Sequence, residues 1–135
     1  MLIKDSGYLF AMLKMCDDIE LYKQKFGSTL LEERIGLNAS LLNISQIGEY
    51  AKNLSTDFQN RFSKIEWIKI KGLRNQIVHN YFGVDREIIE EIVYKDIPLL
   101  IDDLLEILNC LKDADEIDIQ VITELSKDLL VIKIL

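Results

Sequence analysis

The chain of 135 residues is poor in the two residues that interrupt helices, with one proline and only six glycines. So little of either argues against a disordered or low-complexity chain. Apolar residues make up 49% of the sequence, which favours a compact, mostly helical protein. A single domain of this length buries roughly two-thirds of the surface of its unfolded chain.

Cysteine and histidine are also scarce. The two cysteines, Cys16 and Cys110, form no C-x-x-C motif, and His79 is the only histidine. We therefore expect no metal site and no cofactor, and we expect both thiols to be free in a reducing cytosol. No apolar run approaches the length of a membrane span, and the N-terminal apolar stretch is too short for the core of a signal peptide. The sequence thus predicts a cytoplasmic protein.

An excess of positive charge is lacking too, since the net charge is −7. That value argues against a general nucleic-acid binder, whose affinity for phosphates rests on lysine and arginine. Residues 61–86 nevertheless hold six basic and two acidic residues, six minus two or +4, which leaves −11 for the rest of the chain. The asymmetry indicates a local phosphate site on an acidic surface, although a solvated helix face explains any single lysine equally simply.

Apolar residues recur at three- and four-residue steps over most of the chain, which predicts amphipathic helices. The expected helices cover residues 2–25, 30–54, 64–83, 86–94 and 97–113, with a helical turn within 55–62. They predict an all-α, up-and-down helical bundle formed by residues 1–113. Residues 114–135 follow an acidic break and are expected to add a helix or an extended tail that packs on the bundle or on a dimer partner.

Local signals mark the expected ends of these helices. Thr29 and Ser63 each precede a glutamate by three residues, which is the pattern of a capping box. Asp85 and Asp96 are the expected N-caps of the two following helices. Pro98 then falls in the first turn of the second one, where a missing N–H is tolerated.

The most informative stretch is residues 72–83, Gly-Leu-Arg-Asn-Gln-Ile-Val-His-Asn-Tyr-Phe-Gly. In one straight helix, Arg74 and His79 point about 140° apart, and Tyr81 lies on the same line as Arg74. The arginine fork matches a phosphate, and a histidine exchanges protons near neutral pH, so the two suit phosphodiester cleavage. A histidine in the last turn of a helix can equally serve only to complement the helix dipole.

A polar strip precedes this stretch. Asn43, Gln46 and Glu49 are spaced by three in the second expected helix. They form either a solvated face or a support for Arg74 or His79, and Glu49 is the best candidate for that support.

The pattern Arg74-Asn75-x3-His79-Asn80-Tyr81 resembles the R-x4-H-x-Y signature of HEPN-domain toxins of the HepT type. Further segments resemble the same family in the same order, namely residues 47–55, 65–68, 72–75, 84–85 and 96–98. The similarity covers residues 5–112 and leaves out the C-terminal extension. The fold that it implies is a HEPN-like helical bundle.

The resemblance also implies an activity, that of a metal-independent endoribonuclease acting as the toxin of a type II/VII-like toxin–antitoxin system. In it Arg74 would bind the phosphate of the RNA and His79 would act as general acid or base. Asn75 and Asn80 would orient the histidine or the phosphate. The family's partner is a nucleotidyltransferase antitoxin of the MNT type, which can transfer AMP from ATP to the motif tyrosine, here Tyr81.

A homodimer is expected on chemical grounds, because phosphodiester cleavage benefits from an acid and a base while one chain offers a single histidine. A two-fold axis near the motif helices would supply the second copy. Two other functions stay open. The chain could be a non-catalytic helical partner of a nucleotidyltransferase, with Arg74 and Tyr81 in the interface, or a plain helical scaffold, which leaves the motif unexplained.

Overall fold

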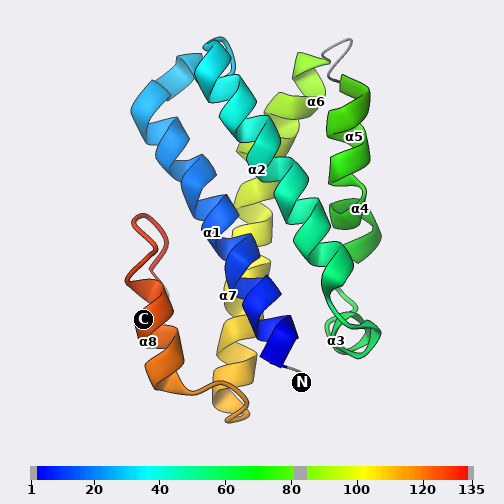
Figure 1. Cartoon of the computed structure of the whole chain (residues 1–135), viewed down its shortest axis with the longest axis vertical. Helices are drawn as coiled ribbons and strands as arrows, with labels where there is room; N and C mark the ends of the chain where they lie inside the picture. Colours follow the sequence, from blue (N-terminus) through cyan, green and yellow to red (C-terminus); the bar gives the residue numbers. More distant parts are fainter. Residues whose placement is uncertain (1–2, 81–84, 134–135) are drawn as a thin grey trace.

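The protein is a bundle of helices with no strand among its described residues, which confirms the predicted all-α fold (Figure 1). The computed structural model describes residues 3–80 and 85–133, and of Ile3, His79 and Asn80 it describes the backbone alone. Within these ranges no helix is long and apolar enough to cross a bilayer. The helices are α1 (Ile3–Phe26), α2 (Arg34–Asn53), α3 (Thr56–Arg61), α4 (Trp67–Lys71), α5 (Leu73–Asn80), α6 (Arg86–Glu91), α7 (Ile97–Asp113) and α8 (Ile119–Ser126).

Helices α1 and α2 form an antiparallel pair, against which α7 and the α4–α5 segment pack (Figure 1). Of the apolar residues that recur in the first helix, Leu9, Leu13, Cys16 and Ile19 are fully buried and Phe26 is half-buried. Both cysteines are free, and burial raises the pKa of the Cys16 thiol far above its ordinary value, which keeps it protonated. Gly27 ends α1 with φ 59°, a conformation that glycine adopts without strain.

The capping box predicted at Thr29 is wrong. Thr29 closes a short 3₁₀ turn, η1 (Gly27–Thr29), and its hydroxyl donates to the carbonyl of Phe26. Helix α2 begins only at Arg34, after Glu33, whose side chain makes no capping bond. The intervening Leu30 is fully buried, and its burial favours the turn before Arg34 over a helix that begins at residue 30.

The motif segment is not the single helix predicted from residue 64. Ser63 does not cap it, since α4 begins at Trp67 after a turn that buries Ile65. The indole N–H of Trp67 donates to the carbonyl of Phe62 at 3.1 Å, which fixes that turn. Gly72 then separates α4 from α5.

Residues 86–113 are helical throughout, so the prediction of a new helix capped by Asp96 is also wrong. Asp85 caps α6 as predicted, by accepting from the N–H of Glu87. Asp96 has helical backbone angles and lies in η2 (Ile92–Asp96), one turn of π-helix that links α6 to α7. Pro98 lacks an N–H, and a π turn, which pairs groups five residues apart, accommodates it without ending the helix.

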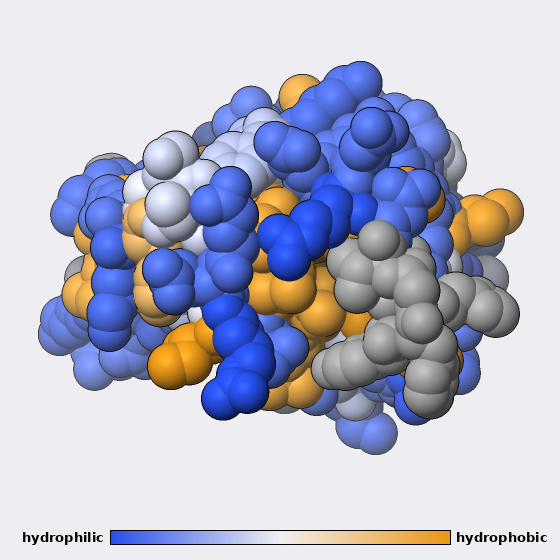
Figure 2. Space-filling model, turned by 90° about the horizontal axis from the view of Figure 1, so that it is seen from above, coloured by the Kyte–Doolittle hydropathy of each residue, from blue (hydrophilic) through white to orange (hydrophobic). Residues whose placement is uncertain are grey.

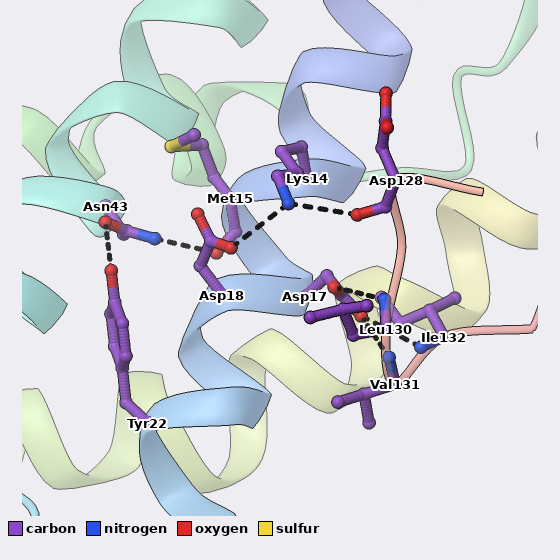
Figure 3. A network of polar contacts seen from close by, with 10 residues as sticks. All are labelled: Lys14, Met15, Asp17, Asp18, Tyr22, Asn43, Asp128, Leu130, Val131 and Ile132. Atoms are coloured by element: carbon purple, nitrogen blue, oxygen red, sulfur yellow. Dashed lines mark hydrogen bonds and ion pairs between the residues drawn. The ribbon is translucent and has the colours of Figure 1, made fainter. Parts of the chain in front are cut away.

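The C-terminal extension consists of α8 and a tail that lies along α1 (Figure 3). The tail is held by Asp17, whose fully buried carboxylate accepts three backbone hydrogen bonds of 2.9–3.0 Å from Leu130, Val131 and Ile132. Lys14 adds a bond from its ammonium to the carbonyl of Asp128 at 3.0 Å. Because Leu129 and Ile132 are buried, the tail belongs to the core of its own chain.

Replacing Asp17 by alanine should release this tail, because three backbone N–H groups would lose their acceptor. We expect a loss of roughly 3 kcal/mol in the free energy of unfolding, since each unsatisfied buried polar group costs about 1–3 kcal/mol and the tail can partly re-solvate. Urea denaturation would measure the loss, and hydrogen exchange would locate it at residues 130–132. Asp18→Asn is the control, because among the described residues Asp18 has only a 3.6 Å ion pair with Lys14. Unchanged protection of the tail in Asp17→Ala would contradict the assignment.

Candidate functional site

The candidate site lies where α2 crosses the junction of α4 and α5, and Gly48 makes this crossing close. A Cβ atom at Gly48 would lie 3.1 Å from the backbone nitrogen of Arg74 and 3.3 Å from the carbonyl oxygen of Ile70. These distances are shorter than ordinary carbon contacts, so a larger side chain would push the helices apart. The sequence shows that Gly48 lies within an amphipathic helix, but it does not show which backbone Gly48 contacts.

The close crossing brings Glu49 and Arg74 together. The Nη1 atom of Arg74 donates to Oε1 of Glu49 at 2.9 Å, and the two side chains are 53% and 35% exposed. An ion pair this exposed contributes only about 0–1 kcal/mol to stability. Its main effect is therefore on orientation, because it holds one corner of a guanidinium on a side chain that is half exposed.

The apolar side of α5 fixes its axis. Leu73 and Ile77 are buried and Ile70 is half-buried, as the sequence predicts. With these residues facing the core, Arg74 and Asn75 are exposed.

The other predicted site residues are described only in part. His79 and Asn80 end α5, and only their backbone is described. Tyr81 lies outside the described residues. The structure thus brings Glu49 to Arg74, and the positions of the histidine, Asn80 and tyrosine side chains remain sequence-based expectations.

The polar strip predicted on α2 does not act as a unit. Asn43 is buried and turned toward α1, where it accepts from the hydroxyl of Tyr22 at 3.2 Å and donates to the carbonyl of Met15 at 3.0 Å (Figure 3). It therefore fastens α2 to α1, and only Glu49 of the three reaches Arg74.

The positive charge of residues 61–86 is spread over several helices rather than gathered into one patch. Most of these cations have an acceptor on a distant part of the chain: Arg61 pairs with Glu116 at 2.6 Å, Lys64 with Glu106 at 2.7 Å and Lys69 with Asp96 at 3.5 Å, and Lys71 donates to the amide oxygen of Gln59 at 2.9 Å. Hydrogen bonding from Arg61 lowers the pKa of Glu116, so this pair stays ionised at neutral pH. The sequence shows the charges but not these partners.

Gly48→Ala should separate α2 from α5 and destabilise the protein by about 1–3 kcal/mol, which is the usual cost of overpacking. Gly7→Ala in α1 is the matched control, because a Cβ there meets no atom within 4 Å. The control should gain about 0.5–1 kcal/mol, since alanine favours a helix over glycine. Urea denaturation of both variants tests the pair, and equal effects of the two substitutions would show that the crossing tolerates a side chain.

Comparison with known proteins identifies the family. The profile of the family described as "Ribonuclease HepT-like" matches residues 12–111. Among similar proteins, "Putative RNase TTE0752" of Caldanaerobacter subterraneus subsp. tengcongensis is 35% identical over 102 residues, which is 75% of this chain and 91% of the relative. "Putative RNase MJ0127" of Methanocaldococcus jannaschii is 31% identical over 111 residues, or 82% of this chain and 92% of the relative.

A shorter match is to "Probable ribonuclease HepT" of Thermococcus cleftensis, with 39% identity over 54 residues, 40% of this chain and 49% of the relative. No solved structure matches. The family match covers most of the bundle and confirms the resemblance seen in the sequence. The chain belongs to the family of HepT-like ribonucleases, enzymes that cleave RNA.

Proposed function

We propose that the chain is a metal-independent RNA endonuclease in which Arg74 binds the scissile phosphate and His79 transfers protons. The observation that carries the proposal is the exposed guanidinium of Arg74, held at one corner by Glu49, in a chain of ribonuclease family. The only histidine of the chain lies five positions after Arg74, within the same helix. Arginine suits a phosphate because its planar fork offers two parallel N–H donors.

The reaction that these groups suit begins at the ribose. The 2′-hydroxyl oxygen attacks the adjacent phosphorus, and its proton passes to a general base. The bond from phosphorus to the 5′ oxygen breaks, and that oxygen takes a proton from a general acid. The products are a 2′,3′-cyclic phosphate and a free 5′-hydroxyl, and no redox change or co-reactant is needed. Arg74 stabilises the charge that grows on the phosphoryl oxygens in the transition state.

Other residues support these two. Asn75, exposed beside Arg74, and Asn80 orient the histidine or the phosphate in this proposal. Glu49 is a positioning residue, because its contact at 2.9 Å is with Arg74. DNA lacks the 2′-hydroxyl and is not a substrate of this mechanism.

The active species in this proposal is a homodimer with the two α5 helices near its axis. Exposed apolar side chains on both helices support this proposal, since Leu42 on α2 is 58% exposed and Val78 on α5 is 50% exposed. The two helices run antiparallel and cross at Gly48 and Arg74, so residues that precede Gly48 lie beside residues that follow Arg74 (Figure 1). A dimer through this surface would let groups from two chains converge on one phosphate.

The partner in the cell is, in this proposal, a nucleotidyltransferase antitoxin that adenylates Tyr81. The family resemblance supports it, as does the position of Tyr81 seven residues, or about two helical turns, after Arg74 in the sequence. An added AMP would bring bulk and negative charge to a site meant for a substrate phosphate.

The first test is cleavage of RNA in the presence of excess chelator. We expect the purified chain to cut single-stranded RNA under these conditions, and Arg74→Ala or His79→Ala to lower the rate at least a hundredfold, which is the usual weight of a catalytic acid, base or charge-stabilising group. Both variants should keep the helical circular-dichroism spectrum of the wild type.

Lys71→Ala is the control for the loss of charge, because Lys71 lies near Arg74 in the sequence and donates to Gln59, away from the motif. It should retain most of the activity. Activity that disappears with chelator would refute the metal-independent mechanism, and full activity of His79→Ala would refute the site. A chain that never cuts RNA but binds the nucleotidyltransferase would be the non-catalytic partner considered from the sequence.

The second test concerns Tyr81. Phenylalanine keeps the ring and removes only the hydroxyl oxygen, so Tyr81→Phe should fold and keep much of its ribonuclease activity. It should also escape neutralisation by an adenylating nucleotidyltransferase of the MNT type, supplied with ATP and magnesium. Intact-mass measurement should show added adenylate units on the wild type and none on the variant. Adenylate on Tyr81→Phe would exclude Tyr81 as the acceptor, whereas its absence from both proteins would mean that the antitoxin acts by masking alone.

A further inference from the structure

A pocket of about 320 Å³ lies between the η1 turn and the helix that carries α6 and the π turn. Its lining residues are Ser28, Leu31, Glu32, Arg86, Glu90 and Tyr94, and we call it the Arg86 pocket. The volume is at the lower limit of ordinary small-ligand pockets, about 300 Å³, and suits a ligand the size of one nucleotide. Its lining combines the buried apolar side chain of Leu31 with the aromatic ring of Tyr94, the cation of Arg86 and two carboxylates.

Arg86 is fixed against the wall of this pocket. Its Nη1 atom donates to the carbonyl oxygen of Leu31 at 2.8 Å. Unlike Arg74, it has no carboxylate within ion-pair distance in the part of the chain that the structure describes. The remaining N–H groups of its fork can therefore take a phosphate without first displacing an acid.

Tyr94 offers a surface on which a base can stack. Tyr94 is 44% exposed, and the ammonium of Lys23 lies over one face of its ring, 5.0 Å from the centre, so a base would stack on the other face. Arg86, Glu90 and Tyr94 are four residues apart, and in a regular α-helix each such step drifts by about 40° around the axis. The π turn has more residues per turn, so it reduces this drift and keeps Tyr94 beside the pocket.

The carboxylates of the pocket favour bases that carry a hydrogen-bond donor. Glu32 and Glu90 form no ion pair with other described residues, and a carboxylate only accepts hydrogen bonds. Exocyclic amino groups of adenine, cytosine and guanine donate to such acceptors. Uracil has a carbonyl at the position of the amino group of cytosine, and two sets of oxygen lone pairs would then face each other.

Helix α6, which carries Arg86 and Glu90 of the pocket lining, lies at the same end of the bundle as the C-terminus of α5 (Figure 1). Asn80 and Arg86 are six residue steps apart, so their Cα atoms are separated by at most about 22 Å. Seen from this end, the surface is mostly hydrophilic, with a hydrophobic area near its centre (Figure 2). A single strand of RNA bound at the motif can therefore reach the Arg86 pocket within a few nucleotides.

We propose that the Arg86 pocket binds one nucleotide of single-stranded RNA near the scissile bond. The base stacks on Tyr94 and donates its amino group to Glu90 or Glu32, and a phosphate of the strand binds Arg86. The site favours adenine, cytosine and guanine over uracil. This proposal rests on the proposed function only where it links the pocket to RNA cleavage, since binding of RNA to the pocket can be measured in a protein that does not cut RNA.

Binding is best measured with Arg74→Ala as the background, so that the RNA stays intact. Fluorescence anisotropy with labelled oligocytidylate and oligouridylate of ten nucleotides measures what the amino group contributes to affinity, because cytosine has an amino group where uracil has a carbonyl. We expect the cytidylate to bind about five- to tenfold more tightly. Adding Glu90→Gln should reduce this ratio toward one. Glu91→Gln is the matched control, because Glu91 is the next residue, pairs with Lys95 and does not line the pocket.

Tyr94→Leu should weaken binding of both oligonucleotides about five- to a hundredfold, which is the usual range for loss of a stacking ring, and Tyr94→Phe should not. Equal affinities for the two oligonucleotides, or a Tyr94→Leu variant that binds normally, would overturn the proposal. Binding of free CMP and AMP at comparable affinity would assign the pocket to a soluble nucleotide instead of RNA. A protein that shows the base preference but never cleaves RNA would refute the proposed function and leave the pocket assignment standing.

Discussion

The close crossing of α2 and α5 at Gly48 is the contact on which the candidate site depends. Only a residue without a side chain lets the backbone of α2 come within reach of the Arg74 nitrogen. The next residue, Glu49, then meets the guanidinium at 2.9 Å. Asn43 fastens the same helix to α1 on its other side, so a polar bond to the core of the bundle and an ion pair at its surface lie within two turns of one helix. The position of Arg74 therefore depends, through α2, on the packing of α2 against α1.

The sequence predicted which segments are helical better than where they begin. The N-cap predicted at Asp85 is confirmed, whereas the signals at Thr29, Ser63 and Asp96 are not used. A capping bond contributes about 1 kcal/mol, while burying one large apolar side chain contributes about 1.5–3 kcal/mol. Near both misread capping boxes a large apolar residue is buried, Leu30 in one case and Trp67 in the other. Burial therefore overrides the local signal, and burial depends on helices that are distant in the sequence.

The same division between local and distant information applies to the site. The types and spacing of Arg74, His79 and Tyr81 are local, and together with the further segments that resemble the family they indicated the family that the profile match confirms. Partners are not local. Glu49 could be proposed because it ends a polar strip, but Asn43 of the same strip turns inward, and nothing in the spacing distinguishes the two. The pairing of Arg61 with Glu116 joins residues 55 positions apart and has no sequence signal at all.

These pairings lower the number of unpaired cations that a chain of net charge −7 offers to RNA. A phosphate that binds Arg61, Lys64 or Lys69 competes with a carboxylate for the cation, so its net gain in free energy is small. Arg74 shares this competition, since Glu49 accepts a hydrogen bond from it, whereas Arg86 lacks such a competitor among the described residues. In the proposed complex Arg74 and Arg86 each contact one phosphate, and two such contacts correspond to a slope of log affinity against log salt near −1.4, by the value of about −0.7 per phosphate for single strands. Stacking and base contacts, which depend on sequence, supply the remaining affinity in this proposal, so binding is more selective than binding that rests on phosphate contacts alone.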